Sequence, residues 1–172
     1  MKPIVVNIFA GPGSGKSTTA AALFAYLKFD GTNVELAQEY AKELVWLEKE
    51  MNQDEIFQVT KERLTIANKV DFLITDGPIL QQLAYTNDFE MSKAIKSEHE
   101  KYFNINFFIE RSDARTFNKS GRTQTESQAR ELDLEIKEML VAQNQKVFNI
   151  KFSKNAPIEM ADIISEQIIG NL

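Results

Sequence analysis

Short runs of apolar residues alternate along the chain with longer segments whose apolar residues recur at helical spacing. Runs of this length, rich in β-branched and aromatic side chains, are typical of buried strands. Strands that alternate with helices predict a parallel sheet with both faces covered, which is a three-layer α/β/α architecture. The predicted strands span residues 4–10, 33–38, 72–75, 103–109 and 148–152.

Two helices in the C-terminal third carry start and stop signals. Apolar residues follow a 3.6-residue period from about Glu126, and Thr125 with Gln128 predicts a capping box at the start of this helix. The last predicted helix has Pro157 in its first turn and Gly170 at its end, which are the positions where these residues are favoured.

A glycine-rich loop joins the first predicted strand to a helix. Its sequence follows the pattern G-x-x-x-x-G-K-[ST], with Ala10 where the first glycine usually stands. Glycines let successive backbone N–H groups surround phosphate oxygens, and the helix directs its positive dipole end at the same charge. Lys16 is expected to reach the β- and γ-phosphates, and Ser17 to ligate Mg²⁺. The residues expected to bind the nucleoside triphosphate are Gly11, Pro12, Gly13, Ser14, Gly15, Lys16, Ser17 and Thr18.

Two carboxylates follow predicted strands and are candidates for chemistry. Asp76 ends the third strand, where a carboxylate beside a triphosphate can hold Mg²⁺ through water; the alternative is that it caps the helix after Gly77 and Pro78. Glu39 follows the second strand, and the alternative for it is an ordinary solvated charge. A kinase needs one carboxylate to take the proton of the acceptor hydroxyl. We favour Glu39 over Asp76 for this role.

The connection after the fourth strand is long, polar and rich in arginine. In an open parallel sheet, such a connection lies at the carboxyl edge, where ligands bind. Arg111, Arg115 and Arg122 are therefore predicted to belong to a lid, at approximately 111–125, and to neutralise the transferring phosphoryl group. Each arginine could instead be a surface residue.

Composition narrows the class of protein. With 172 residues, 43% of them hydrophobic, we expect one domain with a real core. The chain has no cysteine, and no apolar run approaches the roughly 20 residues of a membrane span. We therefore expect a cytoplasmic protein without a membrane partner.

The formal net charge is −5, which argues against a nonspecific nucleic-acid binder. Residues 101–130, however, carry six basic and three acidic side chains, so a local anion site is compatible with the overall sign.

Four other side chains are assigned to structural roles. Trp46, Met51 and Phe57 are expected in the core or the wall of a pocket, with a platform for base stacking as the alternative. His99, the single histidine, lies in a run of charged residues and is expected to be a solvated helix residue.

The chain resembles the P-loop kinase superfamily, in particular its nicotinamide riboside kinase-like and deoxynucleoside kinase-like branch. The resemblance rests on the phosphate loop, on Glu-Tyr-Ala-Lys at 39–42, on Thr-Asp-Gly-Pro at 75–78, and on the lid ending in Gly-Arg-Thr-Gln-Thr-Glu at 121–126. It implies a five-stranded parallel sheet in the order 2-3-1-4-5 and the use of ATP with Mg²⁺. It also implies an acceptor bound between the ends of the second and third strands and the lid.

Within that branch the pattern resembles phage proteins of this size, some of which phosphorylate the hydroxymethyl group of 5-hydroxymethyluracil in DNA. This resemblance implies a kinase that acts on a hydroxyl of a nucleic-acid component. The sequence departs from related kinases at Gly77, where serine is frequent, and in its acidic net charge. A kinase of free nucleosides or nucleotides and a regulatory NTPase remain the alternatives, and the oligomeric state stays open.

Overall fold

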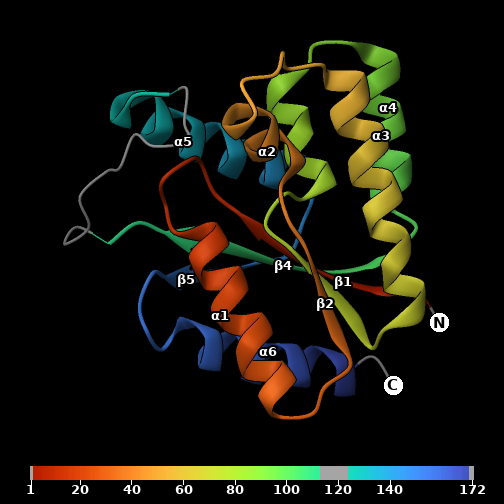
Figure 1. Cartoon of the computed structure of the whole chain (residues 1–172), viewed down its shortest axis with the longest axis vertical. Coiled ribbons are helices and arrows are strands. Elements are labelled where there is room, and N and C mark those ends of the chain that lie inside the picture. The colour runs from red at the N-terminus through yellow and green to blue at the C-terminus, as the bar shows by residue number, and fades with distance from the viewer. Residues whose placement is uncertain (1, 113–123, 171–172) are drawn as a thin grey trace.

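A five-stranded parallel sheet forms the centre of the computed structural model, which describes residues 2–112 and 124–170 (Figure 1). The strand order is β2-β3-β1-β4-β5, which confirms the predicted fold. In order along the chain, the elements are β1 (Ile4–Phe9), α1 (Lys16–Phe29), β2 (Val34–Ala37), α2 (Tyr40–Trp46), α3 (Gln53–Leu64), the 3₁₀ helix η1 (Thr65–Lys69), β3 (Phe72–Thr75), the 3₁₀ helix η2 (Ile79–Tyr85), α4 (Phe89–His99), β4 (Phe103–Glu110), α5 (Glu126–Ala142), β5 (Val147–Lys151) and α6 (Ala156–Ile169).

Helices cover both faces of the sheet. Helices α1 and α6 pack together on one face, and α3, α4 and α5 each contact η2 on the other (Figure 1). The central strand β1 pairs with β3 and β4 on either side, and Ile8, Phe9 and Phe107 in these strands are fully buried. Because all five strands run parallel, their carboxyl ends meet at one edge.

The predicted helix signals are present in the structure. The Thr125 side chain accepts the N–H of Gln128, and the Gln128 side chain accepts the N–H of Thr125, which completes the capping box of α5. Pro157 lies in the first turn of α6, and Gly170 follows the last residue of this helix. In the described part of the chain, no helix is long and apolar enough to cross a bilayer.

The prediction for His99 was wrong. His99 ends α4 but is only 5% exposed, and its Nε2 forms a hydrogen bond with Gln145 Oε1 at 3.0 Å. Gln145 also accepts from Asn106 Nδ2, and Asn106 in turn accepts from Asn7 Nδ2. Polar residues of two central strands thus create a buried polar site for the imidazole, which the charged run around it in the sequence concealed.

The three large apolar residues between the second and third strands have different environments. Phe57 lies in the core, as predicted, and Met51 lies in the wall of a cavity although half of it is exposed. Trp46 is 61% exposed and does not line that cavity, which corrects the prediction that it lies in the core or in the wall of a pocket. Trp46 is the last residue of the seven-residue helix α2, whose buried contact is made by Leu44.

Candidate active site

The phosphate loop lies between β1 and α1 at the carboxyl edge of the sheet. Gly13 and Gly15 have φ angles of 80° and 111°, a backbone conformation that residues with a Cβ atom rarely adopt. Helix α1 begins at Lys16 without a side chain that caps its first N–H groups. The hydroxyls of Ser14 and Thr19 are buried without a hydrogen-bond partner in the structure. Free donors therefore gather at a helix N-terminus, which is the arrangement that binds phosphate.

Glu39 and Asp76 come together beside this loop. Asp76 follows β3 and is 2% exposed, and its Oδ1 accepts the backbone N–H of Glu39 at 2.8 Å. Glu39 lies just before α2, and its Oε2 is 3.4 Å from the Lys16 Nζ. The Asp76 carboxylate does not cap η2, because Pro78 precedes that helix and no side chain caps it. The structure thus places Glu39 beside the lysine of the phosphate loop and Asp76 against the Glu39 backbone.

Gly77 makes this close arrangement possible. A Cβ atom at Gly77 would lie 2.8 Å from the Glu39 Cα and 3.0 Å from its Cβ. Such distances are too short for any side chain without movement of the Glu39 backbone. The glycine that departs from related kinases therefore lets the ends of β2 and β3 bring Glu39 against Asp76.

Lys42 is a site residue that the sequence analysis missed. It lies in α2, and its Nζ donates to the Ser17 Oγ at 3.1 Å. The signal available in the sequence was its spacing, because a residue three positions after Glu39 lies on the same face of a helix.

A cavity of about 530 Å³ extends from the phosphate loop into the space between α2, α3 and η2. At one end it is lined by the loop, Glu39 and Lys42, and at the other by residues that carry no charge. The uncharged lining residues from these helices and their connections are Tyr40, Ala41, Val45, Met51, Gln53, Ile56, Thr60, Gly77, Pro78, Gln81, Gln82 and Tyr85.

The glutamine side chains fix the polar groups of this uncharged wall. Gln82 accepts from Gln53 Nε2 at 3.2 Å and donates to the Thr60 Oγ1 at 3.1 Å. Gln81 donates to the carbonyl of Ala10 at 3.4 Å, and its Oε1 is buried without a hydrogen-bond partner. The wall therefore combines glutamine amides with apolar and aromatic surface, a combination suited to a polar uncharged ligand.

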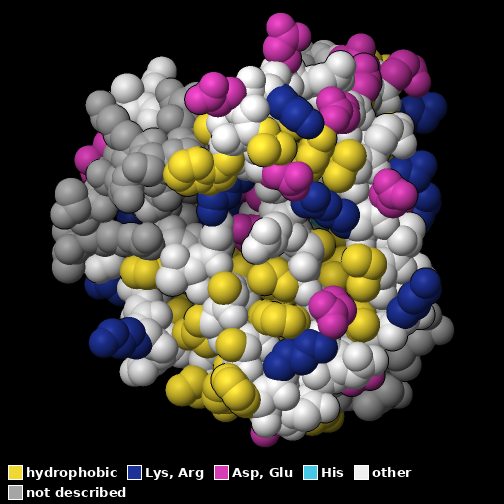
Figure 2. Space-filling model, in the orientation of Figure 1, with side chains coloured by type: hydrophobic (Ala, Val, Ile, Leu, Met, Phe, Trp, Pro, Cys, Tyr) yellow, Lys and Arg dark blue, Asp and Glu magenta, His cyan; other side chains and the backbone are white. Residues whose placement is uncertain are grey.

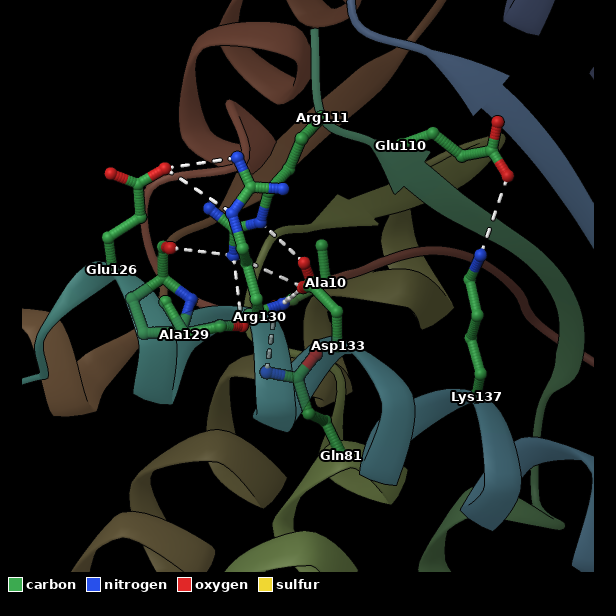
Figure 3. A network of polar contacts seen from close by, with 11 residues as sticks. Ala10, Gln81, Glu110, Arg111, Glu126, Ala129, Arg130, Asp133 and Lys137 are labelled. Atoms are coloured by element: carbon green, nitrogen blue, oxygen red, sulfur yellow. Dashed lines mark hydrogen bonds and ion pairs between the residues drawn. The ribbon is translucent and has the colours of Figure 1, made fainter. Parts of the chain in front are cut away.

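Arg111 braces the phosphate loop through Asp133 (Figure 3). The Arg111 guanidinium forms an ion pair with the Asp133 carboxylate on α5 and donates to the carbonyl of Pro12 at 2.9 Å. The Asp133 Oδ1 also accepts the backbone N–H of Gly11 at 2.6 Å. A Cβ atom at Gly11 would lie 2.5 Å from the Ala129 carbonyl oxygen, so the loop approaches α5 more closely than another residue type allows.

The other predicted lid arginines, Arg115 and Arg122, lie outside the described residues, as does most of the predicted lid. Gln124, at its C-terminal end, lines the cavity. Of the described residues in the predicted lid, Gln124 is therefore the one that reaches the cavity.

The chemistry of these groups fits ATP and Mg²⁺. In the described ranges, no group of three or more acidic or histidine side chains could hold a metal ion by itself. Mg²⁺ in proteins is commonly held by one or two protein oxygens together with substrate phosphates and water. Ser17 supplies a hydroxyl in the phosphate loop, and Asp76 supplies a buried carboxylate next to Glu39, so these two residues could hold Mg²⁺ only together with the nucleotide.

Comparisons with known proteins give the same architecture. Residues 5–156 match the family model described as an AAA domain (AAA_28). No curated protein sequence matches the chain. The crystal structure of a thymidylate kinase from Ehrlichia chaffeensis is similar with a TM-score of 0.61 and 13% sequence identity, covering 96% of this chain and 100% of that one. At that identity the likeness shows the fold, which is the P-loop kinase fold.

Proposed function

We propose that this chain, which belongs to the AAA domain family, is an ATP-dependent kinase that phosphorylates a hydroxyl group of a nucleic-acid component. The observation that carries the proposal is the single cavity that joins the phosphate loop and Glu39 to an uncharged wall of α2, α3 and η2. A kinase must hold the triphosphate and the acceptor in one continuous space, because the reaction is mainly positioning and charge stabilisation.

The proposed reaction assigns a role to each described group. The acceptor oxygen forms a bond to the γ-phosphorus, the bond from that phosphorus to the ADP oxygen breaks, and ADP leaves with the electron pair. Glu39 takes the proton of the acceptor hydroxyl, and Lys16 binds the β- and γ-phosphate oxygens. Ser17 and Asp76 would hold Mg²⁺ together with the nucleotide, and the ion would neutralise charge on the phosphates.

The predicted arginines divide between two tasks in this proposal. Arg111 holds the phosphate loop in place, because its guanidinium is engaged with Asp133 and with the carbonyl of Pro12. Arg115 and Arg122 neutralise the transferring phosphoryl group from the lid.

The uncharged wall of the cavity supports an acceptor whose bound part carries no charge. In the described part of the lining, the cations are Lys16 and Lys42, and both lie at the phosphate-loop end. A volume of about 530 Å³ lies within the usual range for small-ligand sites. A hydroxyl-bearing nucleobase or nucleoside satisfies both observations.

For the specific acceptor we propose 5-hydroxymethyluracil in DNA, with a free nucleoside or nucleotide as the second candidate. The basic segment from Arg111 to Gln124, whose last residue lines the cavity, supports a DNA acceptor, because phosphates are bound by clustered basic residues. The second candidate is supported by the acidic side chains over the α2–α4 end of the molecule, which repel a polyanion (Figure 2). Among them are the exposed residues Glu48, Glu50 and Asp54.

Transfer of label from γ-labelled ATP tests these proposals. The protein with Mg²⁺ is offered 5-hydroxymethyluracil-containing DNA, unmodified DNA of the same sequence, and a panel of free nucleosides and nucleotides in parallel. Label on the modified DNA alone supports the first acceptor, and label on a free nucleoside or nucleotide supports the second. Release of label only as inorganic phosphate would contradict the kinase proposal and indicate a regulatory NTPase. Lys16→Ala is the negative control, because it removes the phosphate-loop cation.

A further inference from the structure

Lys42 directs its ammonium group at the phosphate loop from the acceptor side of the cavity. Its Nζ lies 3.1 Å from the Ser17 Oγ, the hydroxyl of the loop that is expected to ligate Mg²⁺. Lys42 itself lines the cavity and is partly buried. The contact therefore places a positive charge where the nucleotide phosphates are expected to bind.

The other cations near the loop already have carboxylate partners. Lys16 pairs with Glu39, and Arg111 pairs with Asp133. Among the described residues no carboxylate lies within ion-pair distance of Lys42, and its hydrogen-bond partner is the neutral Ser17 hydroxyl. A partly buried ammonium group without an anion is costly, and a bound phosphate would supply the missing anion.

We propose that Lys42 is a second catalytic lysine, which donates to an oxygen of the γ-phosphoryl group on the side that faces the acceptor. The inference rests on the proposed kinase function. When Ser17 ligates Mg²⁺ together with the nucleotide, Lys42 exchanges its hydrogen bond to the Ser17 hydroxyl for one to the γ-phosphoryl oxygen. During transfer, the acceptor oxygen bonds to the γ-phosphorus and the bond to the ADP oxygen breaks. Lys42 stabilises the negative charge on the phosphoryl oxygens while this happens.

The position of Lys42 on α2 couples it to the proposed base. Glu39 immediately precedes α2, and Lys42 lies three residues later on the same helix face. One short element thus presents both the group that takes the proton and the cation that faces the phosphoryl group. A lysine suits this place because its ammonium is a point charge on a flexible stem that can follow the phosphoryl oxygens.

Nucleotide affinities measured by calorimetry test the inference without an acceptor. With Mg²⁺ present, the wild type, Lys42→Met, Lys42→Arg and Lys49→Met are titrated with ATP and with ADP. In Lys42→Met, we expect the preference for ATP over ADP to fall about 10- to 150-fold, the range of one charge-assisted hydrogen bond. ADP affinity should change less than about threefold, since ADP lacks the γ-phosphate. Lys49 is exposed at the end of the same segment, so Lys49→Met should behave like the wild type. Lys42→Arg should keep part of the preference for ATP.

Three outcomes would overturn the inference. Equal losses of ATP and ADP affinity in Lys42→Met would make Lys42 a structural tether of Ser17, and an unchanged ATP preference would remove it from the site. A loss of ATP preference in Lys42→Arg as large as in Lys42→Met, with a lowered melting temperature in both, would indicate a packing role. The inference and the kinase proposal fail separately. A wild type that binds ATP but labels no acceptor contradicts the kinase function, while the ATP-specific loss in Lys42→Met would still support the phosphate contact.

Discussion

Replacing Asp133 by alanine should loosen the phosphate loop from α5. In the wild type, the Asp133 carboxylate pairs with the Arg111 guanidinium and accepts the backbone N–H of Gly11 at 2.6 Å. The variant leaves the Arg111 charge and the Gly11 N–H without this partner. Because Arg111 also donates to the carbonyl of Pro12, the loss should reach both the stability of the fold and the shape of the phosphate loop.

The magnitude follows from burial. The side chains of Arg111 and Asp133 are 12% and 15% exposed, so the pair is largely removed from water. Removing one partner of a buried pair costs about 3–5 kcal/mol, because the other charge stays buried without compensation. In a domain of this size, 1 kcal/mol corresponds to about 2–4 °C, so the melting temperature should fall by about 6–20 °C.

Thermal and denaturant unfolding of three variants measure this effect. Arg130→Gln is the control on the same helix, because the Arg130–Glu126 pair is exposed and such pairs contribute only about 0.3–0.5 kcal/mol. Arg111→Met combined with Asp133→Ala should recover part of the stability lost by Asp133→Ala alone, since no unpaired charge then remains. A loss below about 1 kcal/mol in Asp133→Ala, with unchanged ATP affinity, would refute the bracing role.

Three further variants test the carboxylate site and the buried histidine. Glu39→Gln should lower turnover about 100-fold with little change in ATP affinity, and an unchanged rate in the labelled-ATP assay would remove Glu39 as the base. Gly77→Ala should displace Glu39, because the alanine Cβ would lie 2.8 Å from the Glu39 Cα. Turnover should fall, and denaturation should show that the free energy of unfolding is lower by about 1–3 kcal/mol. Wild-type values of both would contradict the close approach. Burial lowers the pKa of His99 below its ordinary 6.5, so protonation favours the unfolded chain and stability should fall as the pH drops below 6.5. In His99→Gln this part of the pH dependence should disappear from urea unfolding curves, and an unchanged slope would exclude His99 as its source.

The alternation of strands and helices and the ligand-binding edge of the sheet could be predicted because they follow from local pattern and chain direction, whereas the strand order was implied by the resemblance to P-loop kinases. Each of the five strands is a compact apolar run, and the phosphate loop fixes which end of β1 faces the ligand. In a parallel sheet, residues that follow different strands must then meet at that edge. Glu39 and Asp76 were identified in this way, and the pairing of β2 with β3, together with the glycine at position 77, brings them into contact.

The residues that escaped prediction depend on how side chains cross between elements. His99 is surrounded by charged neighbours in the sequence, yet its imidazole faces Gln145, which lies 46 positions further along the chain. Asp133 occupies an ordinary position on α5, and nothing local indicates that its carboxylate reaches Gly11. Such contacts arise from the packing of α4 and α5 against the sheet. The hydrophobic period predicts which face of a helix is buried, but not which side chains of other elements that face contacts.

The contacts of Arg111 change the distribution of charge at the site. The sequence predicted Arg111, Arg115 and Arg122 as equivalent cations of the lid. In the structure, the Arg111 guanidinium pairs with Asp133 and donates to the backbone carbonyls of Pro12 and Ala129. Its charge is therefore largely neutralised before any nucleotide binds. Within the described residues, Lys16 and Lys42 then remain as the cations that line the cavity. If Lys42 contacts the γ-phosphoryl group, its removal should cost ATP preference even with Arg111 intact, whereas removal of Arg111 should weaken ATP and ADP alike through the shape of the loop.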